Sequence, residues 1–214
     1  MRRTLLLCLA ASLTGCCPLF GGEQDEAPPP TSATTPTQPA APTAECPSIE
    51  QAILGTWERE GFVEEYGPGG RYVINGNVGT IRWLAPGRAF LDVGTLHAEY
   101  HLGLTDVNEL IAVDPSHIGS VYRRTSPPPS IPSSCYELRQ RIVGTWVGGT
   151  YTEVYNADGS YRVNALTGTW RETSNGRLHI ETQAGVGDYW WAMLSPTSAV
   201  AFGASMQGTI YTRQ

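Results

Sequence analysis

The chain contains two copies of one segment, and this repeat limits its possible folds more than any other feature. Residues 46–125 align with residues 135–214 at a constant offset of 89 positions and without a gap. About 20 of the 80 aligned positions are identical, among them Gly-Thr-Trp at 55–57 and at 144–146. A constant spacing of this kind indicates two folding units of about 80 residues each.

The first 45 residues belong to neither copy and carry the features of a targeting segment. Two arginines follow Met1, and the apolar run Thr4–Leu13 is too short to span a bilayer. The run leads into Leu-Thr-Gly-Cys, which ends at Cys16. This order of features resembles the signal peptide and lipobox of bacterial lipoproteins. The resemblance implies a signal peptide over residues 1–15, cleavage before Cys16 and a lipid on that cysteine; an ordinary secretory signal cut at a nearby small residue is the alternative.

The residue after the lipobox bears on localisation. Cys17 rather than Asp follows Cys16, and by resemblance to Gram-negative lipoproteins this implies sorting to the outer membrane. We therefore expect a protein of the bacterial cell envelope. Its N-terminal lipid would hold it at the membrane, facing the periplasm or the cell surface.

Two segments have the composition of linkers. Residues 16–45 are rich in Pro, Thr and Ala and have few aliphatic side chains that could bury a core. We expect them to act as a tether between the lipidated cysteine and the globular part. Residues 126–134 are rich in Pro and Ser and separate the copies. Because this second linker is short, the two copies should lie side by side.

The charged residues narrow the classes of partner. All 14 basic residues are arginine and none is lysine, and the arginines form no continuous block. Nucleic acid is therefore not expected as a partner. A chain without lysine offers neither a Schiff-base amine nor a phosphate-loop lysine, and we expect no cofactor.

The sequence does not support catalysis. Residues 203–208 differ from a nucleophile elbow by one residue, and the strand pattern offers no strand-to-helix turn that would present the serine. The four histidines are scattered along the chain, so a Ser-His-Asp set cannot be assembled from them. We expect a protein that is not an enzyme.

The cysteines suggest one disulfide. Cys8 leaves with the signal peptide and Cys16 would carry lipid, so Cys17, Cys46 and Cys135 remain for an oxidising compartment. Three single pairings are possible. We favour Cys46–Cys135, because equivalent positions of two related units can meet across a pseudo-twofold axis. Free thiols or intermolecular pairing are the alternative.

The periodicity inside each copy is that of β-strands. Short runs rich in Tyr, Val, Ile, Thr and Trp alternate with Gly, Pro and Asn-Ala-Asp-Gly clusters every 8–12 residues. The turn at 156–159 pairs Tyr155 with Tyr161, and its counterpart at 67–70 pairs Tyr66 with Tyr72. We predict an all-β protein of two tandem small up-and-down antiparallel β-barrels, with about eight strands per copy. Interleaving of both copies in one barrel is the alternative.

A short helix is expected before each barrel. The first would cover residues 48–54. The second would cover residues 136–143, where Glu137 and Arg141 stand four positions apart, as an ion pair on a helix requires.

The sequence Gly-x-Trp follows the predicted helix in each copy, and an arginine lies near the end of each copy. The arrangement is similar to the calycin superfamily, especially the short lipocalin-like domains of bacterial lipoproteins. The resemblance implies that Trp57 and Arg124, and likewise Trp146 and Arg213, close one end of a barrel through a cation–π contact. Lipocalins that carry ligands have about twice this length per barrel, so short strands favour an interior that side chains largely fill.

One carboxylate in each copy is expected on the aromatic face. In the predicted register Glu64 shares a face with Tyr66 and Tyr72, and Glu153 with Tyr155 and Tyr161. A carboxylate in such a place needs a hydrogen-bond or charge partner. The structural interpretation is a hydrogen bond to a tyrosine or a pair with the barrel arginine; the functional one is contact with a ligand or handling of a proton.

A weak metal-site candidate lies in the first copy. His97, Glu99 and His101 alternate along a predicted strand and would line one face. A flanking pair could share a metal ion, but the outer two are about 13 Å apart. The second copy does not repeat these residue types, so a solvated outer face is the preferred interpretation and no metal is expected.

Trp190 has no counterpart of its kind in the first copy, where the aligned residue is His101. It is predicted to face outward between the inward-facing Tyr189 and Trp191. It would then contact a sugar or a protein, or pack against the other barrel.

Taken together, these features predict a membrane-anchored, non-catalytic lipoprotein. Its two lipocalin-like barrels would form a binding or structural module for an unknown protein or glycan. The alternative is a carrier or sensor of a small apolar, fatty-acid-like ligand in a barrel interior.

Overall fold

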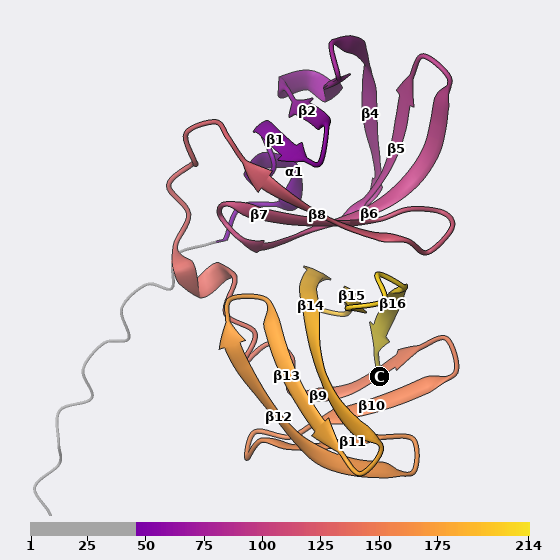
Figure 1. The fold of residues 1–214 in the computed structure, drawn as a ribbon. Helices are drawn as coiled ribbons and strands as arrows, with labels where there is room; N and C mark the ends of the chain where they lie inside the picture. Colours follow the sequence, from indigo (N-terminus) through magenta and orange to yellow (C-terminus); the bar gives the residue numbers. More distant parts are fainter. Residues whose placement is uncertain (1–45) are drawn as a thin grey trace, which may run out of the picture. The chain divides into compact units, whose positions relative to one another are not determined.

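The computed structural model describes residues 46–214, and the predicted signal peptide, Cys16 and the tether lie outside this range. Within residues 46–214, helical structure is limited to α1 (Ile49–Ala52) and two 3-10 turns, η1 (Pro68–Gly70) and η2 (Ser133–Cys135). The rest of the regular structure is β-strand, arranged as two antiparallel barrels in tandem (Figure 1). The all-β prediction is therefore confirmed.

The first barrel, indigo to magenta in Figure 1, has eight strands in chain order. They are β1 (Gly55–Arg59), β2 (Phe62–Tyr66), β3 (Arg71–Ile74), β4 (Asn77–Ala85), β5 (Arg88–Val93), β6 (Leu96–Asp106), β7 (Glu109–Val113) and β8 (Gly119–Arg124). Strand β1 closes the barrel by pairing with β8, where Trp57 lies opposite Arg124.

The second barrel repeats this plan in orange to yellow. Its strands are β9 (Gly144–Gly148), β10 (Tyr151–Tyr155), β11 (Ser160–Val163), β12 (Leu166–Ser174), β13 (Arg177–Thr182), β14 (Gly185–Ser195), β15 (Ser198–Gly203) and β16 (Gly208–Arg213). Strand β9 pairs with β16, and Trp146 lies opposite Arg213. Each copy thus closes by itself, and the interleaved alternative is wrong.

The predicted hairpin registers hold in both barrels. Tyr66 pairs with Tyr72, with ring centroids 5.2 Å apart, and Tyr155 pairs with Tyr161 at 5.0 Å. Gly159 has a φ of 85°, the left-handed conformation that this turn requires and that glycine adopts without strain. The alternation of strand residues therefore placed the two aromatic pairs on the inner face.

The helix predicted over residues 136–143 does not form. Within the described residues the second barrel is preceded only by η2 and a single turn in which the Ile142 N–H donates to the Leu138 carbonyl at 2.8 Å. The Arg141 guanidinium donates to the Cys135 carbonyl instead of pairing with Glu137. The Glu172 carboxylate accepts the N–H groups of Leu138 and Arg139 at 3.0 Å each, so contacts to the barrel wall hold this segment.

Each barrel has its own hydrophobic core, and a third cluster lies between the barrels. The third cluster consists of side chains on the outer faces of β7, β14 and β15: Ile111, Val113, Ala192, Leu194, Val200 and Phe202. All six are buried. The outer surfaces of these strands are thus part of the folded interior.

Aligned residues meet across this interface. Cys46 is joined to Cys135 by a disulfide, with Cα atoms 5.5 Å apart. Ile118 forms a β-bridge with Gln207, its own counterpart in the other copy. Such contacts between equivalent positions define a pseudo-twofold relation between the barrels.

Two pairs of aligned glycines let the barrels approach. A Cβ at Gly119 would lie 2.5 Å from the Phe202 ring, and a Cβ at Gly208 would lie 2.6 Å from the Val113 side chain. Gly87 and Gly176 are in similarly close contact with Leu194 and Thr105. Glycine at these positions is therefore required by close packing against the partner barrel.

Candidate functional site

A tryptophan and an arginine close one end of each barrel. The Arg124 guanidinium lies 4.1 Å from the Trp57 ring centroid and donates to the carbonyls of Ala52 and Leu54 at 2.7 and 2.6 Å. The Trp57 indole donates to the Ile53 carbonyl at 2.7 Å. The arginine thus satisfies carbonyls at the end of α1 while it covers the barrel floor.

The second barrel repeats this closure. The Arg213 guanidinium lies 4.8 Å from the Trp146 ring centroid and donates to the carbonyl of Val143 at 2.9 Å. The Trp146 indole donates to the Ile142 carbonyl at 2.7 Å. Both tryptophans are fully buried. The opposite end of each barrel, at the β1–β2 turn and the β9–β10 turn, is called the mouth below.

A buried glutamate lies above the floor of each barrel. In the first barrel Glu64 is 5% exposed, and the Tyr66 hydroxyl donates to its carboxylate at 2.7 Å. Burial and the charge of Glu64 raise the pKa of Tyr66 well above its usual value. The Tyr72 hydroxyl is also buried and makes no hydrogen bond to the part of the chain that the structure describes. Glu64 is thus held by tyrosine and not by the Arg124 guanidinium, which bonds to backbone carbonyls.

Glu153 occupies the same place in the second barrel and has two tyrosine donors. The Tyr155 hydroxyl donates to one carboxylate oxygen at 2.5 Å, and the Tyr211 hydroxyl donates to the other at 2.7 Å. Burial and the charge of Glu153 raise the pKa of Tyr155, Tyr161 and Tyr211. Both carboxylate oxygens of Glu153 therefore have a tyrosine partner.

The second barrel has an open interior above Glu153. A cavity of about 700 Å³ extends from its mouth to this carboxylate. Its aromatic walls are formed by Tyr151, Tyr155, Tyr161, Tyr189, Trp191 and Tyr211. Two hollows of about 550 Å³ border the first barrel, but Glu64 lines neither of them. The second barrel thus has a cavity at its buried glutamate, although the two glutamates are similarly exposed, at 7% and 5%.

Aligned residues at the mouth explain this difference. Leu96 packs against the first core, and Val93 is 4% exposed within it. The residues aligned with them in the second barrel are Gly185 and Thr182, which line its cavity. Glycine in place of leucine leaves space that belongs to the cavity, whereas threonine is close to valine in size and adds a hydroxyl group.

A third mouth position differs in charge as well as size. Arg59 of the first barrel lies over the rings of Phe62 and Tyr122, 5.1 and 5.2 Å from their centroids, and donates to the Ser120 hydroxyl. The aligned residue in the second barrel is Gly148. A Cβ at Gly148 would lie 2.7 Å from the Tyr211 ring, so a side chain here would displace a cavity wall.

Trp190 packs against the interface and does not project into solvent. Its ring stacks on Phe202 with centroids 5.4 Å apart, and the Arg177 guanidinium lies 3.9 Å from its centroid. The structure thus shows the second of the two alternatives drawn from the sequence. Its neighbour Trp191 is buried, as expected for an inward residue, whereas Tyr189 borders the cavity and is 38% exposed.

The three metal-site candidates of the first barrel have separate partners. His97 contacts Asp92 at 2.9 Å, and Glu99 accepts hydrogen bonds from Arg88. His101 is half-buried, and its pKa is lowered by burial and by Arg88. No group of three or more potential metal ligands comes together within residues 46–214.

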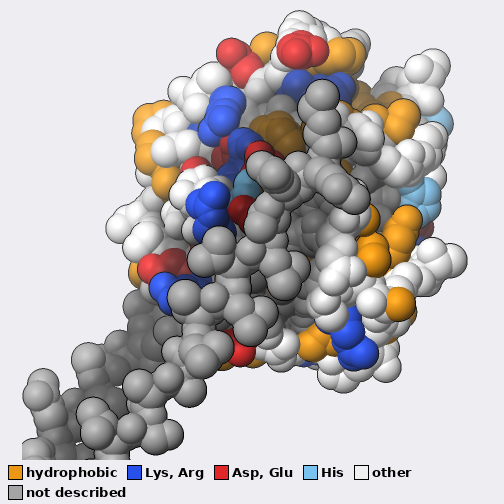
Figure 2. All heavy atoms as spheres, turned by 60° about the horizontal axis from the view of Figure 1, so that its bottom comes forward, with side chains coloured by type: hydrophobic (Ala, Val, Ile, Leu, Met, Phe, Trp, Pro, Cys, Tyr) orange, Lys and Arg blue, Asp and Glu red, His pale blue; other side chains and the backbone are white. Residues whose placement is uncertain are grey.

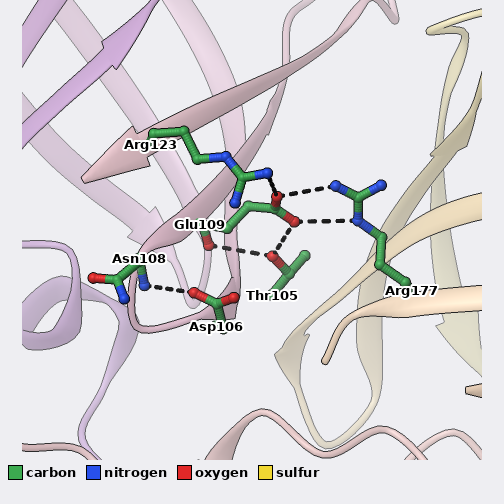
Figure 3. A network of polar contacts seen from close by, with 6 residues as sticks. All are labelled: Thr105, Asp106, Asn108, Glu109, Arg123 and Arg177. Carbon is green, nitrogen blue, oxygen red and sulfur yellow. Dashed lines mark hydrogen bonds and ion pairs between the residues drawn. The ribbon is translucent and has the colours of Figure 1, made fainter. Parts of the chain in front are cut away.

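A polar network between the barrels was not foreseen from the sequence (Figure 3). Glu109 of β7 is 3% exposed and contacts Arg123 at 2.9 Å and Arg177 of the second barrel at 3.0 Å. The Thr105 hydroxyl donates to its carboxylate at 2.7 Å. Arg177 reaches Glu109 from 68 positions away, and the residue aligned with Glu109 is Ser198, so neither spacing nor repetition indicated this contact.

The surface and the chain as a whole add few further indications. On the visible part of the face in Figure 2, arginine and acidic side chains lie interspersed. Among the described residues, no helix has the length and apolar character that crossing a membrane requires.

The paired eight-stranded barrels are consistent with a lipocalin-like fold. No protein-family model matches the chain, and neither a curated protein nor a solved structure matches it significantly.

Proposed function

We propose that the second barrel binds a small ligand in its open interior, and that the chain presents this barrel at the bacterial envelope as a lipid-anchored lipoprotein. The observation that carries the proposal is the cavity of about 700 Å³ above Glu153. Cavities of about 300–1,000 Å³ with apolar walls and few polar groups are typical of small-molecule sites.

Binding to an outer surface has less support than binding inside. The main candidate for an exterior contact, Trp190, is engaged by Phe202 and Arg177. The space between the barrels is occupied by the buried cluster around Ile111 and Phe202. A protein or glycan would therefore have to use another face.

The role proposed is binding and not catalysis. The cavity lining includes Ser205 and several tyrosines, but none of its residues is a histidine, cysteine or lysine that could act as base or nucleophile. The buried Glu153 already accepts two hydrogen bonds from the protein. It is suited to holding a ligand group in a fixed position.

The cavity proposal is tested with a matched pair of exposed aromatic residues. Tyr151, at the mouth of the second barrel, and Phe62, aligned with it in the first, are 50% and 41% exposed. We expect Tyr151→Ala to weaken saturable binding of the uncharged fluorescent probe N-phenyl-1-naphthylamine about fivefold, because it removes an aromatic wall. Phe62→Ala should leave the affinity within about twofold.

Binding of the probe is measured with residues 43–214. These residues form one compact unit that contains the hydrophobic clusters and the disulfide. This avoids partition of the probe into lipid. Absence of saturable binding, or equal weakening by both variants, would refute the cavity as a ligand site.

The anchor is tested at Cys16, which lies outside the described residues. We expect Cys16→Ser to abolish labelling with palmitate and to release the protein from the membrane fraction, because one N-terminal lipid group would carry the attachment. Cys17→Ser is the control and should be labelled normally. A Cys16→Ser chain that still labels and sediments with membranes would show that the lipobox interpretation is wrong.

A further inference from the structure

We propose that the ligand of the second barrel is an organic cation, an amine or quaternary ammonium compound with an apolar body, whose charged group lies beside Glu153. This inference rests on the proposed function and names the chemical class of its ligand. Three observations carry it: the charge of the cavity, its aromatic walls and the comparison with the first barrel.

The interior charge of the cavity is negative. Among the described residues that line it, none is an arginine, histidine or lysine. Of its two acidic residues, Asp188 turns its side chain outward to His179 at 2.7 Å. Glu153 is therefore the charged group of the interior, and it is 7% exposed. A buried carboxylate without a counter-charge is costly even when tyrosines donate to it, so a ligand that brings a positive charge would gain more than a neutral one.

The same charge argues against the fatty-acid-like ligand considered from the sequence. A ligand carboxylate would meet the Glu153 carboxylate in a poorly solvated space, and like charges at short distance repel. The walls also favour a cation. Tyr155, Tyr161, Trp191 and Tyr211 surround the glutamate end of the cavity, and aromatic faces attract ammonium groups.

The first barrel carries an arginine at the mouth position where the second has a glycine. There the Arg59 guanidinium lies over Phe62 and Tyr122, and it opposes the rise in the pKa of Tyr122 that burial and Glu64 cause. Gly148 replaces this arginine in the second barrel, while Glu153, Tyr151 and Tyr211 keep the places of Glu64, Phe62 and Tyr122. The second barrel thus retains the acceptor and the aromatic rings but lacks the cation.

The test compares ligands that differ mainly in charge. Residues 43–214, which lack the proposed lipid anchor, are titrated calorimetrically with 4-phenylbutyltrimethylammonium, with its uncharged carbon isostere 5,5-dimethylhexylbenzene and with the anion 5-phenylpentanoate. We expect the cation to bind at least about tenfold more tightly than the isostere, and the anion to bind most weakly.

Glu153→Gln should weaken binding of the cation about tenfold and leave the isostere within about twofold, because it removes the charge and keeps the shape. Glu64→Gln in the first barrel is the matched control and should change neither affinity. An isostere that binds the unaltered chain as tightly as the cation would overturn the proposal, whether or not the variants fold.

The two proposals can fail separately. If N-phenyl-1-naphthylamine binds saturably but the ammonium probe has no advantage over its isostere, the cavity is a ligand site without selectivity for cations, and the present inference is wrong. If neither the naphthylamine nor the ammonium probe binds, both proposals are refuted.

Discussion

The two barrels share one frame and differ in what occupies it. Both are closed at the floor by tryptophan and arginine, and both hold a buried glutamate hydrogen-bonded by tyrosine. In the first barrel, larger side chains at the mouth, Arg59 and Leu96, occupy positions aligned with Gly148 and Gly185 of the second. The repeat thus kept the residues that build a barrel and varied those that fill it.

This comparison separates structural from functional positions within one chain. A residue type retained at both aligned positions serves the common fold, as Glu64 and Glu153 do when they orient tyrosines. Such a residue can in addition contact a ligand where the barrel is open above it, as at Glu153. The following predictions test how far the likeness and the difference extend, from the largest effect to the smallest.

Raising the pH should affect both barrels alike and remove most of the stability. Burial and the neighbouring glutamate raise the pKa of Tyr66 and Tyr155, and four further tyrosines are shifted upward mainly by burial: Tyr72, Tyr122, Tyr161 and Tyr211. A raised pKa of tyrosine contributes stability that is complete below about pH 10 and is lost above it, at about 1.4 kcal/mol per pH unit and group.

We therefore expect cooperative unfolding between about pH 10 and 12. Tyrosinate absorbance should rise together with the loss of the β-type circular dichroism signal. Tyrosines that ionise near pH 10 while the circular dichroism stays unchanged would contradict the buried hydrogen-bonded arrangement.

Truncation of the floor tryptophan should lower the free energy of unfolding by the same amount in both barrels. Trp57→Ala and Trp146→Ala each remove a fully buried indole and its hydrogen bond to a backbone carbonyl. Each should lower the free energy of unfolding by about 3–5 kcal/mol, measured by urea denaturation. A loss below about 1 kcal/mol for one of them alone would show that the two floors are not equivalent.

Replacing the buried acid between the barrels should reveal an asymmetry. Glu109→Gln leaves Arg177 and Arg123 without a counter-charge, and the side chains of these arginines are 29% and 63% exposed. Because solvent reaches the arginines, we expect a loss of about 2 kcal/mol, less than for a fully buried pair. The aligned Ser198→Ala should change the free energy of unfolding by less than about 0.5 kcal/mol. Equal effects would mean that the Glu109 network contributes little.

The smallest effect compares aligned tyrosines near the mouths. Tyr100 packs against the first core, whereas Tyr189 is 38% exposed and borders the cavity. Tyr100→Ala should cost about 1–2 kcal/mol and leave probe binding unchanged. Tyr189→Ala should cost less than about 0.5 kcal/mol but weaken binding of the ammonium probe. The opposite pattern would place the ligand site in the first barrel.

The sequence predicted much of the fold from local rules. A constant offset indicated two units, and strand alternation with turn chemistry gave the pairing of Tyr66 with Tyr72 and of Tyr155 with Tyr161. Symmetry favoured Cys46–Cys135, the pairing found in the structure. The prediction from local rules was wrong for residues 136–143. There the Glu172 carboxylate accepts two backbone N–H groups, a contact from outside the segment that local rules do not include.

Only part of the candidate site could be predicted from the sequence. Glu153 stood out because a carboxylate fell on the aromatic face, and the exchange of Arg59 for Gly148 and of Leu96 for Gly185 was present in the alignment. Short strands nevertheless favoured filled interiors for both barrels. The glycines at the second mouth were the available signal for a cavity, but a single substitution does not give the volume that remains.

Sequence alone thus determined the strands and turns and the division into two units, because the strand period and the turn residues act over a few neighbouring residues and the repeat is visible in the alignment. Tertiary structure alone decided that Glu153 lies under an open cavity, that Trp190 is covered by Phe202, and that Glu109 meets Arg177. The physical reason is that space inside a barrel, and contact between two barrels, depend on the summed volumes and positions of side chains from many strands at once. A pattern of neighbouring residues in the sequence does not determine these volumes and positions.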